Sequence, residues 1–143
     1  MPMPQNLSVL ILDDDPEIPK LIRSYLRCTK WNLIVTESAR EAVKAADSLH
    51  PDVILCDAEL PEYSGADVIQ ALKSDALTAD IPIVLMTGFA DVSMFAHLAW
   101  TSFLAKPFSA AALRGAIQSA VRGAVPPRIS TLQEPAPNLP VNS

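Results

Sequence analysis

The sequence lacks the features of a secreted or membrane-spanning protein. Its two cysteines, Cys28 and Cys56, fall in helix-like and strand-like stretches, which suits a reducing compartment better than a disulfide framework. The longest apolar runs are about half of the roughly 20 residues that a membrane helix needs. Residues 1–6 place no basic residue before an apolar run, so they make a poor signal peptide. We therefore expect a cytoplasmic protein that does not enter a membrane.

A basic surface is lacking as well. The net charge is −5 at pH 7, and lysine and arginine do not gather in a stripe. A face that binds DNA or RNA normally needs such a stripe, so we expect no nucleic-acid partner. Half of the 143 residues are apolar, which is enough to build the core of one domain of ordinary size.

Short apolar runs alternate along the chain with amphipathic stretches. The strand-like runs are residues 7–12, 31–35, 53–56, 83–86 and 103–105. Between them apolar residues recur at helical spacing, and Ser38 with Glu41 forms a capping box at the start of the second helix. Asp91 opens a short fourth helix, and Gly123 ends the fifth. Strict alternation of strands and helices predicts an α/β fold with a parallel sheet.

The composition changes after Gly123. Residues 124–143 contain Pro126, Pro127, Pro135, Pro137 and Pro140 and have little periodicity. Such a segment does not bury enough apolar surface to fold, so we expect a disordered tail. The sequence thus predicts an N-terminal extension at 1–6, one domain at 7–123 and a Pro-rich tail at 124–143.

Polar residues follow four of the predicted strands. Asp13 and Asp14 follow the first strand, Asp57 the third, Thr87 the fourth and Lys106 the fifth. In a doubly wound sheet, ligands bind at the carboxyl ends of the strands, and parallel strands bring these ends to one edge. We therefore expect these side chains, from both ends of the domain, to form one site.

The expected site has a definite chemistry. Clustered carboxylates repel one another unless a cation joins them, and hard oxygen ligands without nearby His or Cys suit Mg²⁺. A strand-end carboxylate can act as a nucleophile and form an aspartyl phosphate. A metal ion and a lysine can then neutralise the charge of the transferring group. A threonine hydroxyl can donate a hydrogen bond to a phosphoryl oxygen.

The motifs that contain these residues occur in a specific order. They are ILDDDP at 11–16, ILCD at 54–57 with Leu60, Pro61 and Gly65 after it, LMTG at 85–88 and FLAKPF at 103–108. Each motif alone is weak. Together, at these spacings, they resemble the receiver domain of response regulators over residues 7 to about 122, which is nearly all of the predicted domain.

This resemblance implies a flavodoxin-like, doubly wound fold with five parallel strands in the order 2-1-3-4-5 and five helices. It implies that Asp57 is the phosphoacceptor and that Asp13 and Asp14 are the acidic pair that holds Mg²⁺. The backbone carbonyl of Glu59 would complete the metal shell. The chain would then be a signalling receiver and not an enzyme, beyond catalysing its own phosphoryl transfer and slow self-dephosphorylation.

The resemblance also implies how the signal is passed on. Thr87 and Lys106 would contact the phosphoryl group, and Phe103 stands where the family has its switch aromatic. The donor would be a histidine kinase or a histidine phosphotransfer protein. Because only the Pro-rich segment follows the last helix, we expect the output to be a downstream protein target, bound by a monomer or a weak homodimer.

Two other functions compete with this interpretation. Haloacid-dehalogenase-like phosphatases open with an Asp-x-Asp motif that Asp13 and Asp15 match, but Glu17 stands where Thr or Val is usual and no later acidic pair follows the fourth strand. A receiver-like interaction module that has lost phosphorylation is the other alternative. The presence of every expected site residue argues against that module.

One segment departs from the family pattern. The stretch between Thr87 and Lys106 is shorter than usual, and residues 99–102 (AWTS) replace a Gly-Ala with acidic neighbours. Either the fourth helix is merely short and Trp100 packs inward, or the face formed by the fourth helix, fifth strand and fifth helix is reshaped. A reshaped face would bind a non-standard partner or fail to form the usual receiver dimer.

Overall fold

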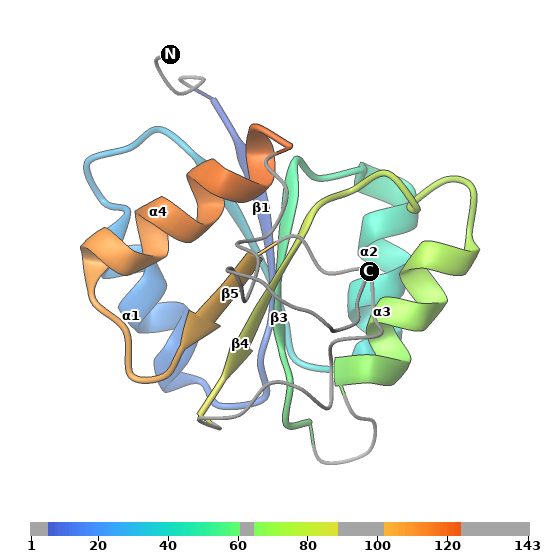
Figure 1. The fold of residues 1–143 in the computed structure, drawn as a ribbon, viewed down its shortest axis with the longest axis horizontal. Coiled ribbons are helices and arrows are strands. Elements are labelled where there is room, and N and C mark those ends of the chain that lie inside the picture. The colour runs from blue at the N-terminus through green and yellow to red at the C-terminus, as the bar shows by residue number, and fades with distance from the viewer. Residues whose placement is uncertain (1–5, 61–64, 89–101, 124–143) are drawn as a thin grey trace, which may run out of the picture.

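The structure is a computed structural model, and it describes residues 6–60, 65–88 and 102–123. In chain order its elements are β1 Ser8–Leu12, α1 Glu17–Tyr25, β2 Asn32–Thr36, α2 Ala39–Leu49, β3 Val53–Asp57, α3 Gly65–Ser74, β4 Ile83–Thr87, β5 Ser102–Ala105 and α4 Ala110–Val121 (Figure 1). The expected fourth helix, which opens at Asp91, lies outside the described residues together with Trp100. The helix labelled α4 is therefore the one that the sequence predicts as the fifth.

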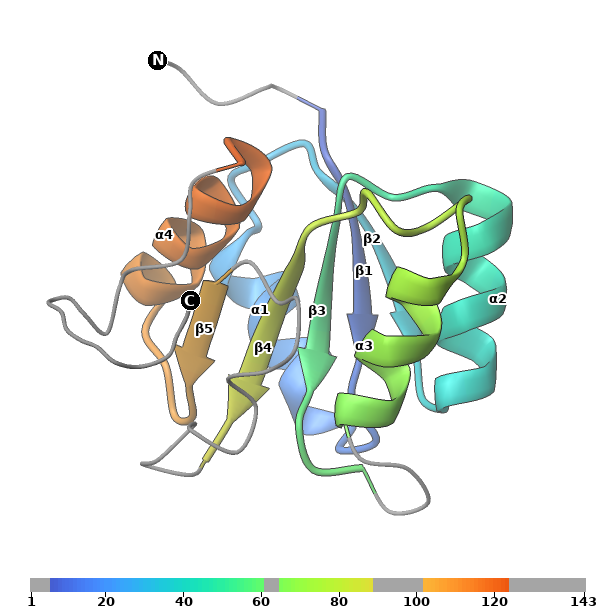
Figure 2. The same cartoon turned by 45° about the vertical axis from the view of Figure 1, so that its right-hand side comes forward.

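The strands form one parallel sheet in the order β2-β1-β3-β4-β5. Helices α1 and α4 cover one face of the sheet, and α2 and α3 cover the other (Figures 1 and 2). The predicted α/β class and strand order are confirmed. This order puts β1 between β2 and β3, so that the carboxyl ends of β1 and β3 are neighbours.

The central strands are buried on both faces, as their continuous apolar runs predict. Along β3, Val53 and Leu55 pack with residues of α1 and α4, whereas Ile54 and Cys56 pack with residues of α2 and α3. Successive side chains of a strand point to opposite faces, so each strand contributes to both cores. No residue of β3 or β4 reaches solvent to any large extent, which makes both strands a firm base for the polar residues at their carboxyl ends.

The predicted start of α2 is confirmed, and each predicted strand boundary lies within one residue of the observed one. Ser38 Oγ accepts a hydrogen bond from the Glu41 backbone N–H at 3.2 Å, which confirms the predicted cap, while Glu41 Oε1 reaches the N–H of Glu37 at 3.0 Å. Strand β2 begins and ends one residue later than predicted, since Thr36 pairs with Leu12 at the end of β1, where its hydroxyl also donates to the carbonyl of Ile11 at 2.8 Å. Within the described ranges, no helix combines the length and apolar character needed to cross a membrane.

Candidate functional site

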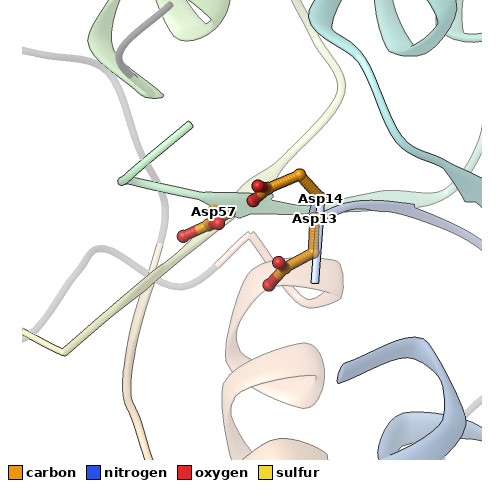
Figure 3. Close-up of side chains that lie close together, drawn as sticks. All are labelled: Asp13, Asp14 and Asp57. Atoms are coloured by element: carbon orange, nitrogen blue, oxygen red, sulfur yellow. The ribbon is translucent and has the colours of Figure 1, made fainter. Parts of the chain in front are cut away.

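Three carboxylates meet where β1 and β3 end side by side (Figure 3). Asp13 and Asp14 follow β1, and Asp57 is the last residue of β3. One oxygen from each of the three can be chosen so that all lie within 4.8 Å of one another. Asp13 and Asp57 are almost fully buried, at 1% and 2% exposure, whereas Asp14 is exposed. The site therefore contains two buried carboxylates, and burying a charge is unfavourable unless it is paired.

Lys106 brings a positive charge to this cluster. Its Nζ donates to Asp13 Oδ2 at 3.0 Å and to Asp57 Oδ1 at 3.2 Å. The Lys106 backbone N–H donates to the carbonyl of Thr87 at 2.7 Å, which ties the residue after β5 to the end of β4. Burial lowers the pKa of Lys106, but the hydrogen bonds and charges of Asp13 and Asp57 outweigh it, so the pKa is raised. The ammonium stays charged at neutral pH.

One ammonium does not offset the charge around Asp57. Burial raises the pKa of Asp57 to about 6, and the charge of Asp13 adds to this. The Glu59 backbone N–H, which donates to Asp57 Oδ1 at 3.1 Å, and the charge of Lys106 act in the opposite direction. The ionised form of Asp57 is thus poorly stabilised, and a divalent cation bound nearby would stabilise it. The donor set of carboxylate oxygens suits a hard cation such as Mg²⁺.

Cys56 is beside the cluster but does not take part in it. The side chain is buried, and burial together with the charges of Asp57 and Asp13 raises the pKa of its thiol to about 12. Metal binding by cysteine requires the thiolate. Cys56 is therefore part of the core, as its sequence context suggests.

Thr87 lies at the same edge, on the neighbouring strand. It is fully buried at the end of β4, and its hydroxyl donates to Glu59 Oε2 at 2.6 Å. The Gly88 N–H donates to Glu59 Oε1 at 3.4 Å. The sequence predicts a role only for the backbone carbonyl of Glu59 and misses its side chain. The available signal is the position of Glu59, two residues after Asp57 at the edge where the five parallel strands end.

Gly65 explains how the loop after Asp57 is held. A Cβ at this position would lie 2.7 Å from Ala58 Cα and 2.8 Å from the carbonyl oxygen of Asp57, closer than atoms can approach. The Gly65 N–H donates to the Ala58 carbonyl at 2.9 Å. The first residue of α3 must therefore be glycine to pack directly against the peptide of Asp57.

Phe103 is not at the same edge. It is the second residue of β5, pairs with Leu85 and is partly buried, whereas Ala105 pairs with Thr87 at the carboxyl end. The structure thus brings Asp13, Asp14, Asp57 and Lys106 together, with Thr87 linked to them through Glu59. A role of Phe103 as a switch stays a prediction.

Comparison with known proteins relates the chain to response regulator receiver domains. The sequence profile of the response regulator receiver domain matches residues 9–118. The polar-differentiation response regulator DivK of Brucella ovis is 35% identical over 105 residues, which are 71% of this chain and 85% of DivK.

Two solved structures have the same fold. The receiver domain of the sensor histidine kinase PA1611 from Pseudomonas aeruginosa, crystallised with a magnesium ion in its active site cleft, has a TM-score of 0.73 at 23% identity, over 82% of this chain and 98% of that one. The chemotaxis response regulator CheY4 of Vibrio cholerae has a TM-score of 0.74 at 23% identity, over 80% of this chain and 98% of that one.

Proposed function

Because this chain belongs to the response regulator receiver domain family of two-component signalling, we propose that it accepts a phosphoryl group on Asp57, with Mg²⁺ as its cofactor. The observation that carries the proposal is the position of the Asp57 carboxylate. It is buried at a strand end, clustered with two further carboxylates and 3.2 Å from the ammonium of Lys106. A carboxylate that accepts a phosphoryl group is helped by this combination, because the metal and the fixed positive charge neutralise the charge of the transferring group.

The metal would be held by Asp13, Asp14, Asp57 and the backbone carbonyl of Glu59. The cluster of oxygens fits a hard divalent cation, and the magnesium ion in the related PA1611 receiver domain supports the choice of metal. When bound, Mg²⁺ supplies charge neutralisation for the transferring phosphoryl group. We expect Asp14 to contact the metal directly and Asp13 to act through water.

The side chains of the protein would carry out the other steps of the proposed phosphoryl transfer. Within the described residues, hydrogen bonds reach both oxygens of Asp13 but only Oδ1 of Asp57, so Asp57 Oδ2 is the oxygen available for attack. Lys106 already lies against Asp57 and would stabilise the phosphoryl oxygens. The Thr87 hydroxyl would donate to one of them, and Thr87 and Phe103 would shift the population between two surface states.

The wider function follows from the family. We assign residues 7–123 to the receiver domain, with residues 1–6 before it and the Pro-rich residues 124–143 after it. The phosphoryl donor would be a histidine kinase or a histidine phosphotransfer protein in the cytoplasm, and the phosphorylated domain would bind a downstream protein target. The likeness to DivK supports this signalling role.

The test is phosphorylation by a small phosphodonor, followed by intact-mass analysis and mapping of the modified residue. We expect one added phosphate on Asp57 that requires a divalent cation and is absent in Asp57→Asn. Asp80→Asn is a matched control, because Asp80 is exposed and pairs with His50 away from the site. Modification that survives in Asp57→Asn would overturn the proposal, and phosphate trapped on Asp13 would favour the phosphatase alternative.

A further inference from the structure

The side chain of Glu59 occupies hydrogen-bond donors next to the phosphoacceptor. Its Oε2 accepts from the Thr87 hydroxyl at 2.6 Å, and its Oε1 accepts from the Gly88 N–H at 3.4 Å. The 2.6 Å distance is typical of a hydroxyl that donates to an ionised carboxylate. The backbone N–H of the same residue donates to Asp57 Oδ1 at 3.1 Å. Glu59 therefore links the acceptor carboxylate to the end of β4.

The two oxygens of Glu59 resemble a phosphoryl group in the donors that they bind. A carboxylate and a phosphoryl group are both anions with several acceptor oxygens, and both form charge-assisted hydrogen bonds with the same kinds of donor. The Thr87 hydroxyl lies one strand away from Asp57, where a phosphoryl group on Asp57 would need donors. A hydroxyl has one proton to donate, so Thr87 cannot donate to Glu59 and to a phosphoryl oxygen at once.

We propose that Glu59 is a positioning residue that occupies Thr87 and Gly88 in the unphosphorylated protein, so that a phosphoryl group on Asp57 must displace its carboxylate. This inference rests on the proposed function of Asp57. Glu59 acts as an internal competitor and weakens binding of the phosphoryl group through Thr87. It also resists a spontaneous change to the state that the phosphoryl group stabilises.

Among the described residues, packing gives no other reason for Glu59 to lie there. The residue is exposed and belongs to neither of the two cores. It adds a carboxylate to an edge where three carboxylates already cluster and Lys106 pairs with only two of them. Placing another negative charge here is unfavourable unless its hydrogen bonds compensate, which ties the position of Glu59 to Thr87 and Gly88.

The size of the effect follows from the population of the competing arrangement. If the arrangement with Glu59 on Thr87 makes up about nine tenths of the free protein, the apparent dissociation constant of a phosphoryl mimic is raised about tenfold. Glu59→Ala removes both the charge and the acceptor. Glu59→Gln keeps an acceptor oxygen but makes a weaker, neutral hydrogen bond, so its effect is intermediate.

The experiment is a titration of the folded chain with beryllofluoride at saturating Mg²⁺, followed through the NMR signals of the Gly88 amide and the Thr87 methyl group. Asp15→Asn is the matched control. Asp15 is exposed at the same edge, and its Oδ1 accepts from the Glu17 N–H, a bond that asparagine retains. We expect Glu59→Ala to bind about tenfold more tightly than the wild type, Glu59→Gln to lie between them, and Asp15→Asn to change by less than about twofold.

A second readout needs no metal. In the metal-free protein, Glu59→Ala should shift the Gly88 amide and Thr87 methyl signals, whereas Asp15→Asn should leave them in place. Equal tightening by Glu59→Ala and Asp15→Asn would overturn the inference, because it would reduce the effect to general charge repulsion. No tightening in Glu59→Ala would overturn it as well. A wild-type protein that binds no beryllofluoride and takes no phosphate on Asp57 would instead overturn the proposed function.

Discussion

The middle of the sheet and its carboxyl edge are built from the same strands, but the middle consists of apolar residues and the edge of polar and charged ones. In β3, the residues from Val53 to Cys56 are apolar and fully buried, and the next residue, Asp57, is a carboxylate with only 2% exposure. In β4, Met86 is fully buried and is followed by Thr87, whose hydroxyl needs a partner. The change from core to site takes one residue. Burial of apolar side chains stabilises the middle of the sheet, whereas burial of carboxylates at its edge costs stability.

The cost at the edge is electrostatic. Burying a charge is unfavourable unless it is paired, and here Lys106 forms ion pairs with two buried carboxylates, Asp13 and Asp57. The pKa of Asp57 is raised because Lys106 does not fully compensate the cost of burying this carboxylate. Substitutions in the two regions should therefore change the free energy of unfolding with opposite signs, even two residues apart on one strand.

The largest effect is expected in the middle of the sheet. Leu55→Ala should lower the free energy of unfolding by about 2–5 kcal/mol, because it leaves a cavity in a fully buried position. Urea denaturation measures this. Leu77→Ala is the control, since Leu77 is 61% exposed and should change stability by less than about 0.5 kcal/mol. Equal losses in the two variants would contradict the difference between core and surface on which the comparison depends.

At the edge the sign should reverse. Asp57→Asn should raise the free energy of unfolding of the metal-free protein at pH 7 by on the order of 1–3 kcal/mol, because it removes a poorly stabilised buried charge at nearly constant volume. Lys106 keeps its partner Asp13 in this variant. Urea denaturation in the presence of a chelator measures the change, and a loss of stability would show that Lys106 already compensates Asp57 fully.

The pH dependence of that gain sharpens the comparison. The pKa of Asp57 is about 6 in the folded protein, whereas an aspartate in the unfolded chain has the ordinary pKa of 3.8. Between these values the folded state binds more protons, so the wild type gains stability from this group as the pH falls. The stability difference between Asp57→Asn and the wild type should be full at pH 7 and vanish near pH 4. Denaturation of both metal-free proteins at pH 7, 5 and 4 tests this, and a constant difference would contradict it.

The smallest effect concerns two neighbouring acidic residues at the edge. Asp14→Asn should weaken Mg²⁺ binding about tenfold, or roughly 1.4 kcal/mol, whereas Asp15→Asn should leave it nearly unchanged. Asp14 has an oxygen in the carboxylate cluster, while Asp15 Oδ1 accepts from the N–H of Glu17 at the start of α1. Calorimetric titration measures both affinities. If both substitutions weakened Mg²⁺ binding equally, the metal would be attracted by the total charge of the edge and not by a direct contact with Asp14.

The sequence predicts the strand order, and it predicts that Asp13, Asp14, Asp57 and Lys106 meet at one edge of the sheet, for one reason. Each strand is a short apolar run, and each site residue directly follows such a run, so that topology alone brings Asp57 and Lys106 to one edge. The side-chain contacts across that edge were not predictable. The hydrogen bond from Thr87 to Glu59 joins residues 28 positions apart, and it depends on a side-chain rotamer that leaves no periodic signal. The sequence also misses the last residue of β2, because that residue, Thr36, belongs to the strand through its pairing with Leu12 of β1.

The double role of Lys106 has a consequence during translation. The ammonium that serves Asp13 and Asp57 enters the chain 93 and 49 positions after them. A ribosome therefore adds all three aspartates to the chain well before Lys106, which pairs with two of them, and the residues of α4 follow only then. A nascent chain that stops short of β5 contains the three aspartates but not Lys106. If Asp57 is the phosphoacceptor, as we propose, the lysine expected to stabilise the phosphoryl oxygens is among the last parts of the domain to be synthesised, so we expect a chain that ends before β5 not to accept a phosphoryl group.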